Sequence, residues 1–292
     1  MNALAAQTYD ASRWELIVVD NGSTAPVAID AIAWPDIDRR VVAEPRLGAN
    51  YARLAGANRS SGELLVFVDD DNVLARDYLE TAHRLFAADP TLGLAGGIIE
   101  PEWLDRQPEF WAEEFLWALA IRDFGDTVIL TDSGSNQGCF PQFAPIGAGM
   151  IGRRSALVKW MAETSESSLA GRRGTDLKCG EDTDMVLSAL GSGWRAGYFP
   201  SLKLTHLIPG GRLEAQYLGR LCRAIAMSLV EVYSKYDVCP WPPIAPWTLP
   251  LRKARAYVRN RAWAGPAEYI RWQGACGQFE GRAMLARQSR AA

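Results

Sequence analysis

The sequence predicts an α/β fold with a mostly parallel central sheet flanked by helices. Two observations lead to this prediction. In the first half of the chain, short apolar runs rich in β-branched residues alternate with amphipathic helical patterns, as in parallel sheets connected by helices. Acidic residues directly follow two of these runs, Asp20 in one case and Asp69–Asp71 in the other. In such sheets, ligands bind beyond the carboxyl ends of the strands.

The expected strands and helices alternate along the chain. Strands are expected at residues 15–19, 40–43, 64–69, 92–99 and 202–206. Helices are expected at residues 48–59, 75–88, 180–190 and 211–236, with two more after residue 250. Residues 101–146 are expected to form a helix and then a loop over the site. We therefore divide the chain into an α/β domain, residues 1–210, and a helical C-terminal extension, residues 211–292, with a proline-rich linker at 239–250.

The net charge of −3 conceals an uneven distribution of charge. Residues 250–292 contain nine Lys/Arg and two acidic residues, so this segment carries +7 and residues 1–249 carry −10. A basic tail that bears tryptophans suits phospholipid headgroups, and we expect peripheral membrane contact through residues 250–292. A solvated helical face would explain the same residues. Nucleic acid is not expected as a partner, because the basic residues form no recognisable binding motif.

The cysteine pattern and the hydropathy are typical of a cytoplasmic protein. No two of the five cysteines have the spacing of metal ligands or of a redox pair, which indicates free thiols in a reducing compartment. No run reaches the roughly 18 apolar residues of a membrane helix, and residues 1–7 lack the features of a signal peptide. We expect a cytoplasmic location, with the basic tail at the inner face of the membrane.

The segment from Leu64 to Asn72 carries the strongest single signal in the sequence. Three consecutive acids, Asp69, Asp70 and Asp71, follow its apolar run, and their charges repel one another unless a cation lies among them. Carboxylate oxygens suit Mg²⁺ or Mn²⁺, and such an ion could carry a phosphate there. A solvated acidic turn after a strand is the alternative, and these nine residues alone leave both interpretations open.

Four motifs follow one another along the chain: Val18-Val19-Asp20-Asn21-Gly22-Ser23, Val68-Asp69-Asp70-Asp71, Gly180-Glu181-Asp182 and Thr205-His206. In this order and spacing they resemble the family 2 glycosyltransferases, inverting enzymes with the GT-A fold. The intervening Asn50-Tyr51-Ala52-Arg53 and Gly62-Glu63 also look like the family's pattern. The resemblance extends to about residue 215 and implies that residues 1–210 form a GT-A catalytic domain.

The resemblance implies a nucleotide-sugar donor, linked to UDP or GDP, and a divalent metal, Mn²⁺ or Mg²⁺. Asp71 matches the metal ligand of the family's DxD motif, and Asp69 matches a residue that contacts the donor ribose or the water shell of the metal. Asp20 matches an acid that accepts a hydrogen bond from the nucleotide base. The donor-binding residues implied in this way are Asp20, Asn21, Gly22, Ser23, Asn50, Arg53, Asp69 and Asp70. For Gly22 and Ser23, an ordinary Gly-Ser turn is the alternative.

The remaining motifs resemble the catalytic end of the family's site. Asp182 matches the base that takes the proton from the acceptor hydroxyl, and Glu181 matches a residue that helps to position it. Both acids would also suit the positive end of a helix dipole without any chemistry. His206 matches a histidine that some members use as a further metal or diphosphate ligand, although a lone histidine is often structural. Arg212 could contact the diphosphate or be solvated.

The start of the chain departs from the family pattern. Members open with a strand of the type Val-Ile-Ile-Pro-Thr-Tyr-Asn, whereas Met1–Tyr9 resemble the end of the helix that follows it. A start site assigned too late, a truncated chain or a degraded gene would each explain the difference. Because this strand would be interior to the sheet, we expect weaker nucleotide-sugar binding and lower stability than in a chain extended upstream.

We expect an inverting glycosyltransferase that moves a sugar from a nucleoside-diphosphate donor to a hydroxyl acceptor, in polysaccharide or glycolipid synthesis. The resemblance implies that the acceptor is lipid-linked or a growing polysaccharide. Two alternatives stay open. One is an inactive, truncated scaffold or binding module that keeps the transferase fold. The other is a nucleotidyltransferase, although no Gly-rich, basic phosphate loop occurs near the start of the sequence.

Overall fold

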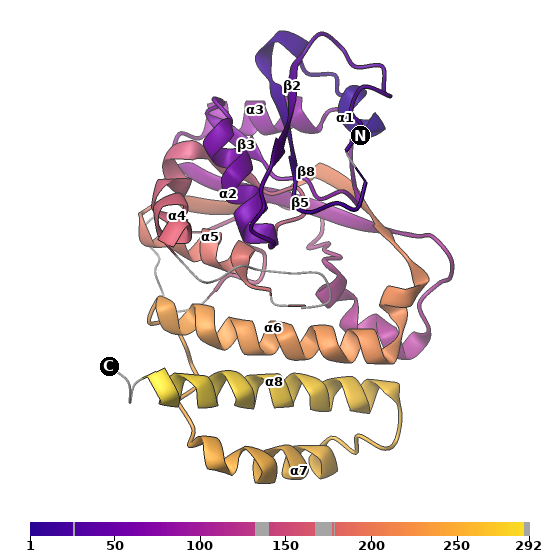
Figure 1. The fold of residues 1–292 in the computed structure, drawn as a ribbon, viewed down its shortest axis with the longest axis vertical. Helices are drawn as coiled ribbons and strands as arrows, with labels where there is room; N and C mark the ends of the chain where they lie inside the picture. Colours follow the sequence, from indigo (N-terminus) through magenta and orange to yellow (C-terminus); the bar gives the residue numbers. More distant parts are fainter. Residues whose placement is uncertain (26, 132–139, 167–176, 178, 289–292) are drawn as a thin grey trace.

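The computed structural model describes residues 1–292 except residues 26, 132–139, 167–176, 178 and 289–292. An α/β part, ending with a strand at Ile208, lies above three long helices in Figure 1. The N-terminus lies in the α/β part, in the short helix α1 (Asn2–Ala5), which is followed by a 3-10 turn, η1 (Ala11–Arg13).

The central sheet has six strands in the described part of the chain, in the order β3-β7-β5-β8-β4, with β6 paired to β8. The strands are β3 (Leu64–Val66), β4 (Asn72–Leu74), β5 (Leu92–Trp103), β6 (Ile129–Leu130), β7 (Ile151–Arg153) and β8 (Arg195–Ile208). The long strands β5 and β8 run parallel, and the other four pairings are antiparallel. The α/β prediction with helices flanking a sheet is therefore confirmed. The prediction of a mostly parallel sheet is wrong for the central sheet, because four of its five strand pairings are antiparallel.

A second, two-stranded sheet lies beside the central one. Strands β1 (Glu15–Asp20) and β2 (Asp38–Ala43) pair in parallel, and among the described strands β1 has no further partner. The Glu15 carboxylate links this pair to the segment before β3 by accepting hydrogen bonds from the backbone N–H groups of Ser61 and Gly62. The strands predicted at residues 15–19 and 40–43 are confirmed.

Several predicted boundaries are wrong. β3 ends at Val66, so the three acids lie in the loop between β3 and β4 and not at the tip of a strand. Strand β5 continues to Trp103, opposite Ile208, so the helix expected from residue 101 begins only at Phe110. β5 and β8 support each other along their whole length, which the pattern of either strand alone does not reveal. Part of the expected loop over the site, residues 132–139, lies outside the described residues.

Helices cover both faces of the central sheet. The helices of this part are α2 (Ala49–Arg59), α3 (Tyr78–Ala88), α4 (Arg154–Glu166) and α5 (Glu181–Gly191). Leu54, Trp160 and Met185 from α2, α4 and α5 form one buried cluster with Leu94 of the sheet. Its neighbour Ala95 belongs to the cluster that α3 covers, and successive side chains of a strand point to opposite faces. The helices predicted at residues 48–59, 75–88 and 180–190 are confirmed, whereas α4 was not predicted.

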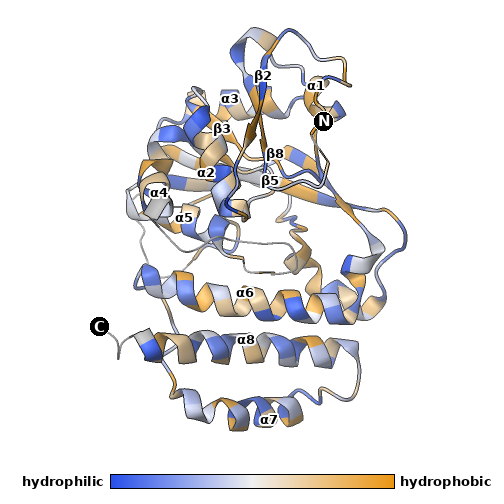
Figure 2. Cartoon of the chain, in the orientation of Figure 1, coloured by the Kyte–Doolittle hydropathy of each residue, from blue (hydrophilic) through white to orange (hydrophobic). Residues whose placement is uncertain are grey.

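The C-terminal part forms a layer of helices below the α/β part (Figures 1 and 2). Its elements are η3 (Gly210–Leu213), α6 (Ala215–Lys235), η4 (Pro246–Thr248), α7 (Leu249–Arg259) and α8 (Pro266–Gln288). Helix α6 lies against the 3-10 helix η2 (Phe110–Leu119), α8 packs on α6, and α7 packs on α8. The expected linker is shorter than predicted, because Pro250 already lies in the first turn of α7, where proline is tolerated. Among the described helices, none has both the length and the apolar character needed to cross a bilayer.

Candidate functional site

Asp71, His206 and Arg212 meet at the edge of the central sheet. Asp71 directly precedes β4, whose first residue Asn72 pairs with His206 in β8. Asp71 Oδ2 lies 3.2 Å from His206 Nε2 and 2.9 Å from Arg212 Nη2. The Nη1 atom of Arg212 lies 3.2 Å from the same His206 nitrogen. A carboxylate, an imidazole and a guanidinium from three segments thus share one small volume.

A backbone contact fixes the tautomer of His206. The ring is buried, and its Nδ1 atom lies 2.9 Å from the carbonyl oxygen of Leu119 in η2. Because a carbonyl oxygen can only accept, Nδ1 carries the hydrogen. With Nδ1 held by this contact, the Nε2 atom is the one that faces Asp71 and Arg212. This is the arrangement in which a protein prepares a histidine to bind a metal.

The Asp71 carboxylate is held in its ionised form. Burial raises its pKa, but the hydrogen bond with His206 and the positive charge of Arg212 outweigh burial, so the pKa lies below the usual value. Asn72 donates a hydrogen bond to the other oxygen, Oδ1, at 3.0 Å. The orientation of this carboxylate is consequently fixed from both sides.

The donor set at this position fits a divalent cation supplied with further ligands by a substrate. Among the described residues, no three His, Cys, Asp or Glu side chains gather in a way that could hold a metal ion. Asp71 Oδ2 and His206 Nε2, 3.2 Å apart, are nevertheless spaced so that one ion could contact both. Mg²⁺ and Mn²⁺ sites in nucleotide-using enzymes often have one or two protein ligands and take the rest from phosphate oxygens and water.

Arg53 in α2 joins the acidic loop to the start of α5. Its Nη2 atom lies 3.1 Å from Asp69 Oδ1, and its Nη1 atom lies 3.3 Å from Glu181 Oε1. Burial lowers the pKa of Arg53, but the negative charges of Asp69, Glu181 and Asp182 outweigh burial and raise the pKa. The guanidinium therefore stays charged and neutralises acids from two segments.

Asp182 lies directly beside this guanidinium. Its Oδ1 atom accepts a hydrogen bond from the Thr183 N–H at 2.7 Å, and its Oδ2 atom accepts one from the Gly147 N–H at 3.3 Å. A Cβ atom at Gly147 would lie 2.3 Å from Arg53 Nη2, so only glycine lets the guanidinium and the amide approach the acid together.

A second arginine that sequence reasoning missed, Arg122, is partly buried and lies near Asp182. Arg122 donates hydrogen bonds to the carbonyl oxygens of Gln142 and Ala144 at 2.9 and 2.7 Å. Burial lowers its pKa, and the negative charge of Asp182 opposes that shift. The only signal in the sequence is a basic residue that ends the apolar run Trp117–Ile121.

The Asp20 motif lies at the end of β1, in the smaller sheet. Asp20 Oδ1 accepts a hydrogen bond from the Ser23 N–H at 2.9 Å, which lowers the pKa of this exposed carboxyl. Asn21 holds the next loop: its Nδ2 atom donates to the carbonyl oxygens of Glu44 and Arg46, and its Oδ1 atom accepts from the Gly48 N–H. Asn21 therefore shapes the loop, and its donor contact stays a prediction.

The other predicted donor residues differ in exposure. Gly22 has a positive φ of 91°, which glycine adopts without strain and which turns the chain after β1. Asn50 is 2% exposed at the start of α2. The Asp70 carboxylate is exposed and makes no hydrogen bond or ion pair within the described part of the chain. The structure thus brings Arg53, Asp69, Glu181 and Asp182 together, and Asp71 with His206.

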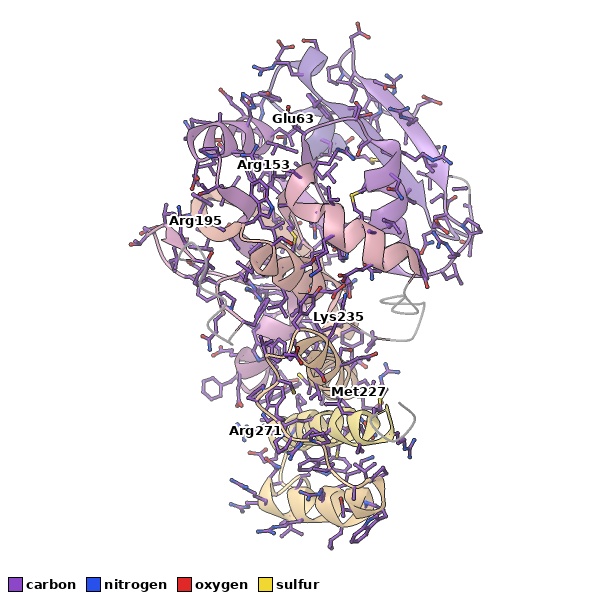
Figure 3. The ribbon with its side chains drawn as sticks, turned by 90° about the vertical axis from the view of Figure 1, so that its left-hand side faces the viewer. Glu63, Arg153, Arg195, Met227, Lys235 and Arg271 are labelled. Atoms are coloured by element: carbon purple, nitrogen blue, oxygen red, sulfur yellow. The ribbon has the colours of Figure 1, made fainter. Side chains whose placement is uncertain are left out.

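Helix α5, which carries Asp182, is anchored to the helical layer. Asp184 is 3% exposed, and its Oδ1 atom accepts hydrogen bonds from Lys235 Nζ at 2.7 Å and from the Tyr236 hydroxyl at 2.9 Å. Lys235 also lies 2.9 Å from Glu163 of α4. Figure 3 labels Lys235 at the junction between the α/β part and the helices below it. The C-terminal end of α6 therefore fixes the N-terminal turn of α5.

Comparison with known proteins gives consistent matches. The sequence model of "Glycosyl transferase family 2" matches residues 1–157. A glucosyl-dolichyl phosphate glucuronosyltransferase of Haloferax volcanii is 31% identical over 130 residues, which are 43% of this chain and 41% of the relative. An N-acetylglucosaminyltransferase of Azorhizobium caulinodans is 26% identical over 246 residues, which are 77% of this chain and 57% of the relative. The chain therefore spans about half the length of these curated relatives.

Solved structures show the same fold. TarS 1-349 of S. aureus in complex with UDP-GlcNAc gives a TM-score of 0.52 at 13% identity, over 99% of this chain and 86% of that one. The mannosyltransferase PcManGT of Pyrobaculum calidifontis, in complex with GDP-Man and Mn²⁺, gives 0.50 at 21% identity, over 100% and 74% of the two chains. At these identities the likeness establishes the GT-A fold and nothing further.

Proposed function

Because the chain belongs to glycosyl transferase family 2, we propose that it transfers a sugar from a nucleoside-diphosphate donor to an acceptor hydroxyl, with inversion at the anomeric carbon. The observation that carries this proposal is the position of Arg53 between Asp69 and Glu181. This contact joins the loop proposed to hold the donor to the helix turn that presents Asp182. One site would then hold the leaving group and the base on opposite sides of the sugar.

The proposed reaction is a single displacement. The acceptor oxygen forms a bond to the anomeric carbon, the bond from that carbon to the diphosphate oxygen breaks, and the diphosphate leaves with the electron pair. Asp182 takes the proton of the acceptor hydroxyl. Inversion follows because no enzyme nucleophile takes part. Glu181 and Gly147 orient the base, one through Arg53 and the other through its backbone N–H.

Asp71 and His206 are the residues that would hold a divalent metal. A bound Mg²⁺ or Mn²⁺ would act as a Lewis acid on the leaving diphosphate. Arg212 would add a fixed positive charge at the same place, since its guanidinium already contacts both residues. When the donor binds, the Arg212 guanidinium would exchange part of its contact with Asp71 and His206 for contact with the phosphate oxygens. Asp20 and Ser23 would face the nucleotide base at the end of β1.

The donor and the acceptor are proposed from the class of the relatives. Structures of similar fold bind UDP-GlcNAc and GDP-Man, which supports a uridine or guanosine diphosphate sugar as donor. One relative is named for a glucosyl-dolichyl phosphate substrate, which supports a lipid-linked sugar as acceptor and a role in glycolipid or polysaccharide synthesis. Such an acceptor would be reached from the cytoplasmic face of the membrane.

A panel of nucleotide sugars with Mn²⁺ tests the proposal through release of UDP or GDP, with and without lipid-linked and oligosaccharide acceptors. We expect turnover with at least one donor, and Asp182→Asn should lower kcat by about 10²- to 10⁴-fold while nucleotide binding persists. Asp77→Asn is the matched control, because Asp77 is exposed, lies outside the predicted site and makes no side-chain cap hydrogen bond at the start of α3. Full activity in Asp182→Asn would refute the assignment of the base. Nucleotide binding without any turnover would instead support the inactive binding module.

A further inference from the structure

Helix α7 presents a face that no other part of the described chain covers. Its inner face packs on α8: Ala256 is buried, and the backbone oxygen of Lys253 accepts a hydrogen bond from Trp272 Nε1. Figures 1 and 2 show α7 as the outermost helix, on the side of the molecule away from the α/β part. The side chains on the face of α7 opposite Ala256 therefore point into solvent.

That outer face is apolar along its centre. Leu251 and Val258 are seven residues apart, so they lie on the same side of the helix, and they are 74% and 63% exposed. Two tryptophans flank the helix, Trp247 just before it and Trp263 just after it, and they are 81% and 58% exposed. Soluble surfaces rarely gather exposed apolar side chains in this way without a partner.

Positive charge surrounds this apolar stripe. The segment from 238 to 267 contains five basic residues and no Asp or Glu. The side chains of three of the five, Arg255, Arg259 and Arg261, make no hydrogen bond or ion pair within the described residues. Arg271 of α8, by contrast, pairs with Glu114 and Glu268. Among the basic residues of α7, Lys253 pairs with Glu280 of α8, so the lack of an acidic partner is a property of Arg255, Arg259 and Arg261 and not of every basic residue in the layer.

We propose that α7 docks this protein on a bilayer that contains anionic phospholipids. The helix would lie in the plane of the interface, with Leu251 and Val258 inserted among the acyl chains and the three arginines reaching the lipid phosphates. Tryptophan rings are favoured at this depth, because they are apolar with one polar N–H group. The inference does not depend on the sugar-transfer activity, since it concerns a different surface.

The charge on α7 favours a lipid surface over a second copy of the chain. Two copies joined through this face would bring two sets of unpaired arginines together, which costs free energy through repulsion. Each arginine near the surface of an anionic bilayer instead raises the affinity of the protein for that bilayer by about fivefold. The apolar stripe alone would suit a bilayer and a second copy of the chain equally well. The positive charge near it favours the bilayer.

Vesicle co-sedimentation tests the proposal with purified protein. Vesicles of phosphatidylcholine with about one third phosphatidylglycerol are expected to bind the protein at least tenfold more tightly than vesicles of phosphatidylcholine alone. The double substitution Leu251→Ser with Val258→Ser should weaken this binding at least tenfold. The double substitution Arg255→Gln with Arg259→Gln should also weaken vesicle binding at least tenfold. All these side chains are exposed, so the fold should persist, as circular dichroism melts would verify.

Two control variants match these changes elsewhere on the surface. Val158→Ser on α4 removes an equally exposed valine, 59% exposed, and Arg220→Gln removes an exposed arginine of α6. Both should bind vesicles like the unaltered protein. Failure of the protein to bind anionic vesicles, or equal binding by the α7 and control variants, would overturn the proposal. A loss of dimer mass in light scattering for the α7 variants, without vesicle binding, would show that the face joins two copies instead.

Discussion

Arg53 and Glu181 are 128 residues apart in the sequence, and their side chains lie 3.3 Å apart in the fold. Both are largely buried, with 11% and 10% of the side chains exposed. The guanidinium also contacts Asp69, so it is the link between two segments that belong to different elements. The catalytic proposal depends on this link, because it fixes the donor loop relative to the helix turn that carries Asp182.

Replacing Arg53 with methionine should therefore destabilise the protein. Glu181 would keep its buried charge without the guanidinium, and breaking a buried pair from one side costs about 3 kcal/mol. Arg53→Lys keeps the charge but loses the forked geometry that reaches two carboxylates, so we expect about half that loss. Urea unfolding followed by tryptophan fluorescence measures both. Equal stability of Arg53→Met and the unaltered protein would show that the contact is not formed.

The acids of the loop should differ in their effect on nucleotide binding. Asp71→Asn removes the charge that faces His206 and Arg212, so binding of UDP or GDP in the presence of Mn²⁺ should weaken about 10- to 100-fold. Asp70→Asn should bind within about twofold of the unaltered protein, since Asp70 is exposed. Isothermal titration calorimetry with and without Mn²⁺ measures the effect. Similar losses in both variants would contradict the assignment of Asp71.

Much of this site could be predicted because it depends on short motifs at element ends. Asp69 and Asp71 follow an apolar run, and Glu181 and Asp182 open a helix, so local pattern alone places them. What the pattern does not contain is their partners. The N–H of Gly147 reaches Asp182 from a loop, and the charge of Arg122 lies near the same acid. The carbonyl of Leu119 that fixes His206 belongs to a 3-10 helix 87 residues away.

The errors in the fold have a similar origin. The long strand β8 begins at Arg195, seven residues before the predicted start, because it is stabilised by β5 along its length. The antiparallel strand β7 has only three residues, too few for a periodic pattern. Helix α4 was overlooked although it packs Trp160 into the core, since the apolar positions of α4 form only a weak stripe. The bounds of these strands depend on pairing between segments far apart in the chain, which a single sequence does not reveal.

Glu280 of α8 should make the helical layer sensitive to acid. It pairs with Arg223 of α6 and with Lys253 of α7, and so it joins all three helices. Burial raises the pKa of Glu280, but the hydrogen bonds from Arg223 and Lys253 outweigh it, so the pKa in the folded state is below the ordinary value of 4.5. A depressed pKa contributes stability above the unfolded pKa, and that stability is lost as the pH falls through the folded pKa.

Glu280→Gln should consequently lower the free energy of unfolding by about 1 kcal/mol at pH 7, a modest value because the partners are partly exposed. At a pH below 4.5 the difference in stability between the variant and the unaltered protein should be smaller than at pH 7. Urea unfolding at both pH values measures the difference, with the exposed Glu63→Gln as control. A difference that persists unchanged at the lower pH would refute the assignment to Glu280.

Close packing of α8 on α6 depends on a glycine. A Cβ atom at Gly277 would lie 2.0 Å from the carbonyl oxygen of Arg223, which belongs to the rigid backbone of α6 and cannot move aside. Gly277→Ala should therefore separate the helices and lower the free energy of unfolding by about 2 kcal/mol or more. Gly274 is the matched control on the same helix, because nothing lies within 4 Å of its Cβ position. Gly274→Ala should raise stability by about 0.5–1 kcal/mol, since alanine favours the helix over glycine. Thermal and urea unfolding of both variants would show opposite signs, and equal shifts in the same direction would contradict the close approach of the two helices.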